Sequence, residues 1–67
     1  MAAAHFTVGE RVRLRKAALG VRSGSVGTIR LVYRYVDDAY DVQFDRHAKP
    51  QLIYARDLEP VDRELTV

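Results

Sequence analysis

The sequence predicts an all-β fold, because short runs of alternating apolar and polar residues are separated by glycine-bearing turns. Residues 6–13 form one such run, the segment GSVGTI at residues 24–29 opens a second, and residues 40–45 form a third. The chain has 67 residues and no cysteine, so we expect one domain without disulfide reinforcement. Turn-and-strand units repeated in so short a chain are typical of a single five-stranded SH3-like barrel.

The first two strands follow from alternation and from one glycine. Val12 and Leu14 alternate with arginines over residues 10–16, so this strand has an apolar inner side and a basic outer side. The second strand spans residues 26–36. Gly27 inside it indicates a bulge or a sharp bend, which lets one strand serve both halves of a small barrel.

The remaining strands are shorter. Asp37 and Asp38 favour a turn, and the alternating residues 40–45 then form the third strand. Residues 51–55 and 59–61 form the fourth and fifth strands, and residues between them form one turn of 3₁₀ helix. The expected core is Val12, Leu14, Val26, Ile29, Leu31, Tyr40, Val42, Phe44 and Leu58.

The domain boundaries follow from the position of these strands. We expect residues 1–5 to be a flexible leader, residues 6–61 to be the barrel, and residues 62–67 to be a polar tail. No apolar stretch approaches the roughly 20 residues of a membrane span, and the first residues lack the pattern of a secretory signal. A cytoplasmic protein that does not bind membranes is the resulting expectation.

The net charge of +2 hides an uneven distribution. Residues 1–36 carry seven lysines and arginines against one acid, whereas residues 37–67 carry four against eight carboxylates. A basic half is typical of nucleic-acid binding, but neighbouring strands that pair opposite charges give the same distribution. We favour cross-strand pairing, with Asp41 and Asp45 facing the arginines. The candidate basic face is Arg11, Arg13, Arg15, Arg30 and Arg34.

No arrangement of residues indicates catalysis. Ser23 and Ser25 flank a glycine in a sequence context that activates neither hydroxyl. The two histidines, His5 and His47, do not have the spacing of a metal-ligand pair. We therefore expect no catalytic residue, no metal site and no cofactor.

Residues along most of the chain resemble the plasmid-borne type B dihydrofolate reductases, which are small SH3-like barrels. The similar positions are Phe6, the segment GERVR at residues 9–13, Tyr40, Val42, His47, Ile53, Tyr54, Leu58 and Glu59. The resemblance implies four protomers around one pore that binds NADPH and dihydrofolate. Ile53 and Tyr54 would line this pore, and Arg15 would attract the anionic ligands. Leu14 and Leu52 stand where the family has a ligand-anchoring lysine and a pore glutamine.

The same opening strand and the turn at residues 24–29 are also similar to barrels that are not catalysts. These are the photosystem I peripheral subunit, the variable subunit of ferredoxin–thioredoxin reductase and the barrel of the nitrile hydratase β-chain, each of which docks on a larger protein. The leading hypothesis is accordingly a non-catalytic binding or assembly module. An NADPH-dependent reductase of the type B class is the alternative, and a nucleic-acid-binding barrel is the third.

A domain of this size has little stability in reserve, which favours association with itself, as a dimer or tetramer, or with a larger protein. We expect Leu52 to face the core and its neighbour Ile53 to lie on the outer surface. An apolar outer patch would mark an interface, and a histidine there would weaken assembly as the pH falls through about 6.5. The candidate interface residues are Val32, Tyr35, His47 and Ile53.

Overall fold

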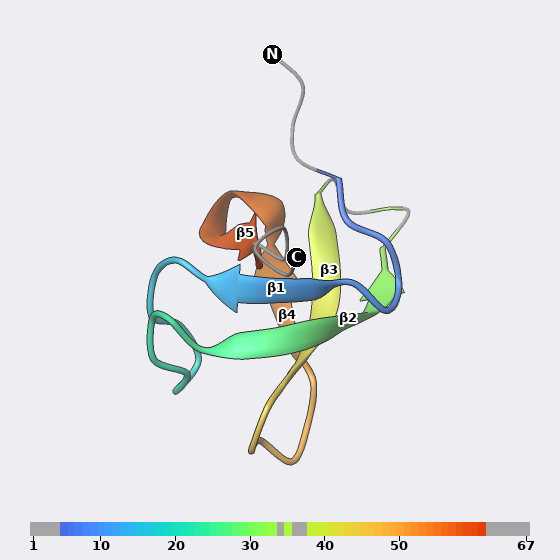
Figure 1. Cartoon of the computed structure of the whole chain (residues 1–67). Helices are drawn as coiled ribbons and strands as arrows, with labels where there is room; N and C mark the ends of the chain where they lie inside the picture. The colour runs from blue at the N-terminus through green and yellow to red at the C-terminus, as the bar shows by residue number, and fades with distance from the viewer. Residues whose placement is uncertain (1–4, 34, 36–37, 62–67) are drawn as a thin grey trace, which may run out of the picture.

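A computed structural model describes residues 5–33, 35 and 38–61, and it confirms the all-β, five-stranded barrel. All strand pairs are antiparallel, and the order across the sheet is β4-β3-β2-β1-β5. Figure 1 shows β1 and β2 lying side by side while β3 and β4 run steeply across them, so the sheet curls over on itself. The elements are β1 (Arg11–Leu14), β2 (Val26–Val32), β3 (Ala39–Phe44), β4 (Gln51–Tyr54), the 3₁₀ helix η1 (Ala55–Asp57) and β5 (Leu58–Pro60).

The core fills the inside of this curled sheet. Val12 and Leu14 of β1 and Val42 of β3 are fully buried, as their alternation with polar residues predicts. Phe6 covers one end of the core. Its ring packs edge-on against the Tyr40 ring, with 5.5 Å between the ring centres, and its backbone N–H donates to the Tyr40 hydroxyl. The buried residues are Phe6, Val12, Leu14, Val21, Ile29, Ala39, Tyr40, Val42, Phe44, Ile53, Ala55 and Leu58.

The bend in β2 is a bulge, and it lies further along the strand than Gly27. Ile29 stands opposite Val42, whereas Leu31 stands opposite the preceding residue of β3, Asp41, so Arg30 is an extra residue in β2. An extra residue moves the following side chains to the other face of the sheet. Leu31 is therefore 47% exposed, and its predicted place in the core is wrong. Val26, also predicted in the core, is only half-buried.

Gly27 serves a different purpose, which is the close approach of β2 and β3. A Cβ at this position would lie 2.8 Å from the carbonyl oxygen of Gln43 and 2.9 Å from the Cα of Phe44. Both atoms belong to backbone, which cannot move aside as a flexible side chain can. The strand pair therefore tolerates no side chain at residue 27.

The faces of β4 are the reverse of the prediction. Ile53 pairs with the buried Tyr40 and is only 3% exposed, whereas Leu52 pairs with the outward Asp41 and is 37% exposed. The sequence of β4 is apolar on both sides, so its alternation does not choose a face, and the register with β3 decides. Ile53 is thus a core residue, and the prediction that it lies on an outer interface is wrong.

Replacing Gly27 with alanine should destabilise the barrel by about 1–3 kcal/mol, the usual cost of overpacking a fitted interior. Urea denaturation at neutral pH measures this loss. Ser23→Ala, in the exposed loop before β2, is the matched control and should stay within about 0.5 kcal/mol of the parent. Equal stability of Gly27→Ala and the parent would contradict the close approach described above.

Candidate protein-binding surface

The outer side of β2, β3 and β4 carries an apolar surface built from two rows of side chains. In the first row Leu31 stands opposite Asp41, which stands opposite Leu52. In the second row Tyr33 bonds by its backbone N–H to Ala39, which stands opposite Tyr54. We call this surface the outer face, and it consists of Leu31, Tyr33, Asp41, Leu52 and Tyr54, whereas Ala39, on the same side of β3, is itself buried. The bulge at Arg30 creates it, because without that extra residue Leu31 would point inward.

Two polar groups of the outer face, the Tyr33 hydroxyl and the Asp41 carboxylate, bond to each other. The Tyr33 hydroxyl donates to Oδ1 of Asp41 at 2.8 Å, and this hydrogen bond to a carboxylate raises the pKa of Tyr33 above its usual value of 10.0. At the rim, the Arg56 guanidinium lies 5.2 Å from the centre of the Tyr54 ring, within the range of a cation–π contact. Both tyrosines are therefore held in place, and Tyr54 still exposes 40% of its surface.

A shallow hollow adjoins the outer face at the end of β2. It is lined by Val8, Leu31, Val32 and Tyr33, which come from the N-terminal turn and from the end of β2. Val8 is 63% exposed. Val32 is exposed as predicted, but it stands opposite the inward Tyr40 and therefore not on the outer side where it was expected. An exposed apolar surface of this kind, on one side of a small barrel, is typical of a site that contacts another macromolecule.

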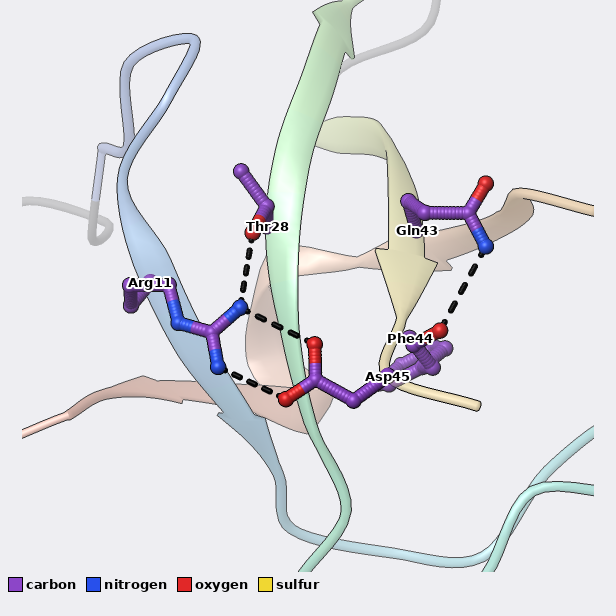
Figure 2. Close-up of polar contacts among 5 residues, drawn as sticks. All are labelled: Arg11, Thr28, Gln43, Phe44 and Asp45. Carbon is purple, nitrogen blue, oxygen red and sulfur yellow. Dashed lines mark hydrogen bonds and ion pairs between the residues drawn. The ribbon is translucent and has the colours of Figure 1, made fainter. Parts of the chain in front are cut away.

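The candidate basic face is partly neutralised by the neighbouring strands. Figure 2 shows the Arg11 guanidinium forked onto the Asp45 carboxylate, with Nη1–Oδ1 and Nη2–Oδ2 distances of 3.0 and 2.7 Å. Nη1 of Arg11 also donates to the hydroxyl of Thr28, at 2.8 Å. Arg13 pairs with Glu59 across β1 and β5, at 3.2 Å. The predicted pairing of Asp45 with an arginine is therefore confirmed.

The other acid expected to face an arginine behaves differently. Asp41 accepts the hydrogen bond from Tyr33 and forms no salt bridge among the described residues. Arg15 and Arg30 are exposed, and Arg34 lies outside the described part of the chain. Of the candidate basic face, Arg11 and Arg13 are thus paired with carboxylates, whereas Arg15 and Arg30 form no salt bridge among the described residues.

The remaining predicted site residues lie apart from one another. Tyr35 is 98% exposed in the connection between β2 and β3. His47 is exposed in the turn before β4, where its ring meets Phe44 edge-on at 6.2 Å and its carbonyl accepts a hydrogen bond from the Gln43 amide. Gln43 also donates to the carbonyl of Phe44 (Figure 2). Tyr35 and His47 therefore lie on separate parts of the surface, in the connections at opposite ends of β3.

The residues implied by the reductase resemblance are only partly brought together. Arg15 donates to the backbone carbonyl of Arg56 at 3.4 Å, and Arg56 covers Tyr54, so Arg15 and Tyr54 lie near the same end of the barrel. Ile53 lies in the core, and its side chain does not reach the surface that Tyr54 shares. Leu14, at the position of the family's lysine, is completely buried.

The described residues contain no cluster of three or more histidine, cysteine, aspartate and glutamate side chains that would hold a metal ion. No aspartate, glutamate, histidine, lysine or arginine side chain in this part of the chain is buried, and none of its buried side-chain nitrogen or oxygen atoms lacks a hydrogen-bond partner. No helix in residues 5–33, 35 and 38–61 is long and apolar enough to cross a membrane.

Comparison of the chain with models of known protein families, with curated protein sequences and with solved structures found no match. The function is therefore inferred from the chemistry of the surface. Sequence reasoning missed Leu31 and Leu52 as surface residues because it placed both in the interior, and it did not single out Val8. The apolar run in β4, which has too many apolar residues for one face, could have indicated Leu52, but no such signal exists for Leu31.

The Arg11–Asp45 pair should make stability depend on pH in the acidic range. Arg11 lowers the pKa of Asp45 below its usual value of 3.8 by its hydrogen bonds, so the pair stabilises the folded state above that value. Its contribution is lost as the pH falls through the lowered pKa of Asp45. Asp45→Asn should therefore lower the urea midpoint slightly at pH 7, and this difference from the parent should shrink below pH 4.

Asp38→Asn is the matched control, since Asp38 is exposed, forms no salt bridge among the described residues, and has a left-handed φ of 57° that asparagine also adopts. It should leave the midpoint nearly unchanged at both pH values. A difference between Asp45→Asn and the parent that is equal at pH 7 and pH 3 would show that the ion pair is not the cause.

Proposed function

We propose that this barrel is a non-catalytic assembly module that associates with a second copy of itself through the outer face. The observation that carries the proposal is the row formed by Leu31 and Leu52 on either side of Asp41, with Tyr54 beside it. Exposed leucine and tyrosine side chains on β2 and β4, the strands on either side of β3, are costly to leave in water and favourable to bury against a partner.

The charges of the outer face suit a second copy. Asp41 lies between the leucines, and Arg56 lies at the rim beside Tyr54, so one face carries both an acid and a base. A two-fold axis presents the same face to itself, which allows the base of each copy to approach the acid of the other. A domain of this size has only about 3–5 kcal/mol of stability from its own core, and burial of the outer face adds to it.

The two other hypotheses have less support. A reductase of the type B class would need Ile53 beside its ligands, and Ile53 is a core residue. A nucleic-acid-binding barrel would need free cations on one face, and Arg11 and Arg13 already bind carboxylates. Docking on a larger protein through the same outer face is the closest competitor to self-association. The role of His47 in assembly and the cytoplasmic location stay predictions.

Leu52→Glu should weaken self-association by about tenfold or more, because it places a charge in the middle of the proposed interface. Sedimentation equilibrium over a range of protein concentrations measures the dissociation constant. Leu19→Glu is the matched control, since Leu19 is 62% exposed in the loop between β1 and β2, away from the outer face. It should associate as the parent does, and circular dichroism should show both variants folded.

A parent protein that stays monomeric at millimolar concentration would overturn self-association and favour docking on a different protein. Equal weakening by Leu52→Glu and Leu19→Glu would show that the outer face is not the interface. Weakening by Leu52→Glu alone would support the proposal.

A further inference from the structure

The last residues of β2 have an open edge. β1 pairs with β2 only as far as Thr28, after which Gly9 and Glu10 exchange backbone hydrogen bonds with Ile29 at 2.8 and 2.9 Å. Gly9 has a φ of +95°, a left-handed conformation that ends the pairing. Val8 still lies beside the end of β2, but no backbone hydrogen bond joins residues 5–8 to β2 within the described part of the chain. β2 continues to Val32, beyond the last residue that pairs with β1. On the side opposite β3, therefore, no strand among the described residues flanks the last residues of β2 (Figure 1).

The backbone of Val32 points toward this open edge. The N–H of Tyr33 donates to the carbonyl of Ala39 in β3, at 3.1 Å. Backbone groups of successive residues in a strand point to opposite sides, so the N–H and C=O of Val32 point away from β3. Unpaired backbone groups at a sheet edge form a template on which another strand can add.

The hollow described above lies beside this edge. It is lined by Val8, Leu31, Val32 and Tyr33, so an added strand would find an apolar recess for one of its side chains. Peptide recognition by strand addition uses the same two parts: backbone hydrogen bonds supply affinity, and recesses for alternate side chains supply specificity.

The positive charge of Arg30 favours one kind of added strand. Arg30 is exposed and forms no salt bridge within the described part of the chain. Antiparallel pairing of two copies of this edge would bring their Arg30 side chains close together, which is unfavourable. A strand that carries carboxylates meets the same arginine favourably, so the occupant is not a second copy of this edge.

We propose that the open edge of β2 at residues 30–32 binds an extended peptide in which aliphatic and acidic residues alternate, as an additional strand of the barrel. An aliphatic side chain of the peptide fills the hollow, and a carboxylate faces Arg30. This site adjoins the outer face, because Leu31 and Tyr33 belong to both, but the backbone hydrogen bonds that it uses do not depend on self-association.

The proposal is tested by NMR titration of the full chain with a blocked seven-residue peptide of alternating valine and glutamate. The amide signal of Val32 should shift, and its hydrogen exchange should slow in the complex. The same peptide with alternate amides N-methylated should not bind, because it cannot form the backbone hydrogen bonds. Binding of the N-methylated peptide as tightly as the parent peptide, or an unmoved Val32 signal, would overturn strand addition.

The charge preference is tested with a second peptide that has lysine in place of glutamate. The glutamate peptide should bind about fivefold more tightly than the lysine peptide, and Arg30→Glu should reverse this order. Arg46→Glu is the matched control, because Arg46 is exposed in the turn after β3. This variant should still bind the glutamate peptide more tightly than the lysine peptide. Equal affinity for the two peptides would overturn the acidic class of partner.

Discussion

The surface of this barrel depends on the bulge between Ile29 and Leu31 in β2. Ile29 faces the core opposite Val42, and two residues later Leu31 faces solvent opposite Asp41. A regular strand would place these two side chains on the same face, because side chains alternate with a period of two. The extra residue, Arg30, therefore decides which side chains fill the interior and which are available to a partner.

The bulge works together with Gly27, which allows β3 to approach the first half of β2 closely. β2 pairs with β1 in its first half and with β3 along its length, so it belongs to both parts of the curled sheet. A bulge increases the local twist of a strand, which is what this change of direction requires. The sequence indicated a bend from the presence of Gly27, but the irregular position is three residues further on, at an arginine that nothing in the sequence singles out.

The strands that the sequence predicts well are those in which polar residues separate the apolar ones. β1 and β3 both have this pattern, and Val12, Leu14, Val42 and Phe44 are buried as predicted. In β4 the pattern is lost, because Leu52, Ile53 and Tyr54 are all apolar or aromatic. Only the register with β3 assigns their faces, and register depends on a partner strand that is distant in the sequence. Phe6 and Val21 were missed as core residues for a similar reason, since both lie outside the strands and reach the core through the path of the chain.

The arginines show the same dependence on strand partners. Arg11 and Arg13 lie on a regular strand and find carboxylates beside them, Asp45 after β3 and Glu59 on β5. Arg30 is the extra residue of the bulge, so no residue of β3 stands opposite it. The regular pairing of strands therefore neutralises part of the excess of basic residues in the first half of the chain. The bulge that turns Leu31 outward also leaves Arg30 without a residue opposite it, and it does so beside the open end of β2. Within the described part of the chain, an apolar surface, a cation without a salt bridge and an open strand edge thus arise at one place from a single inserted residue.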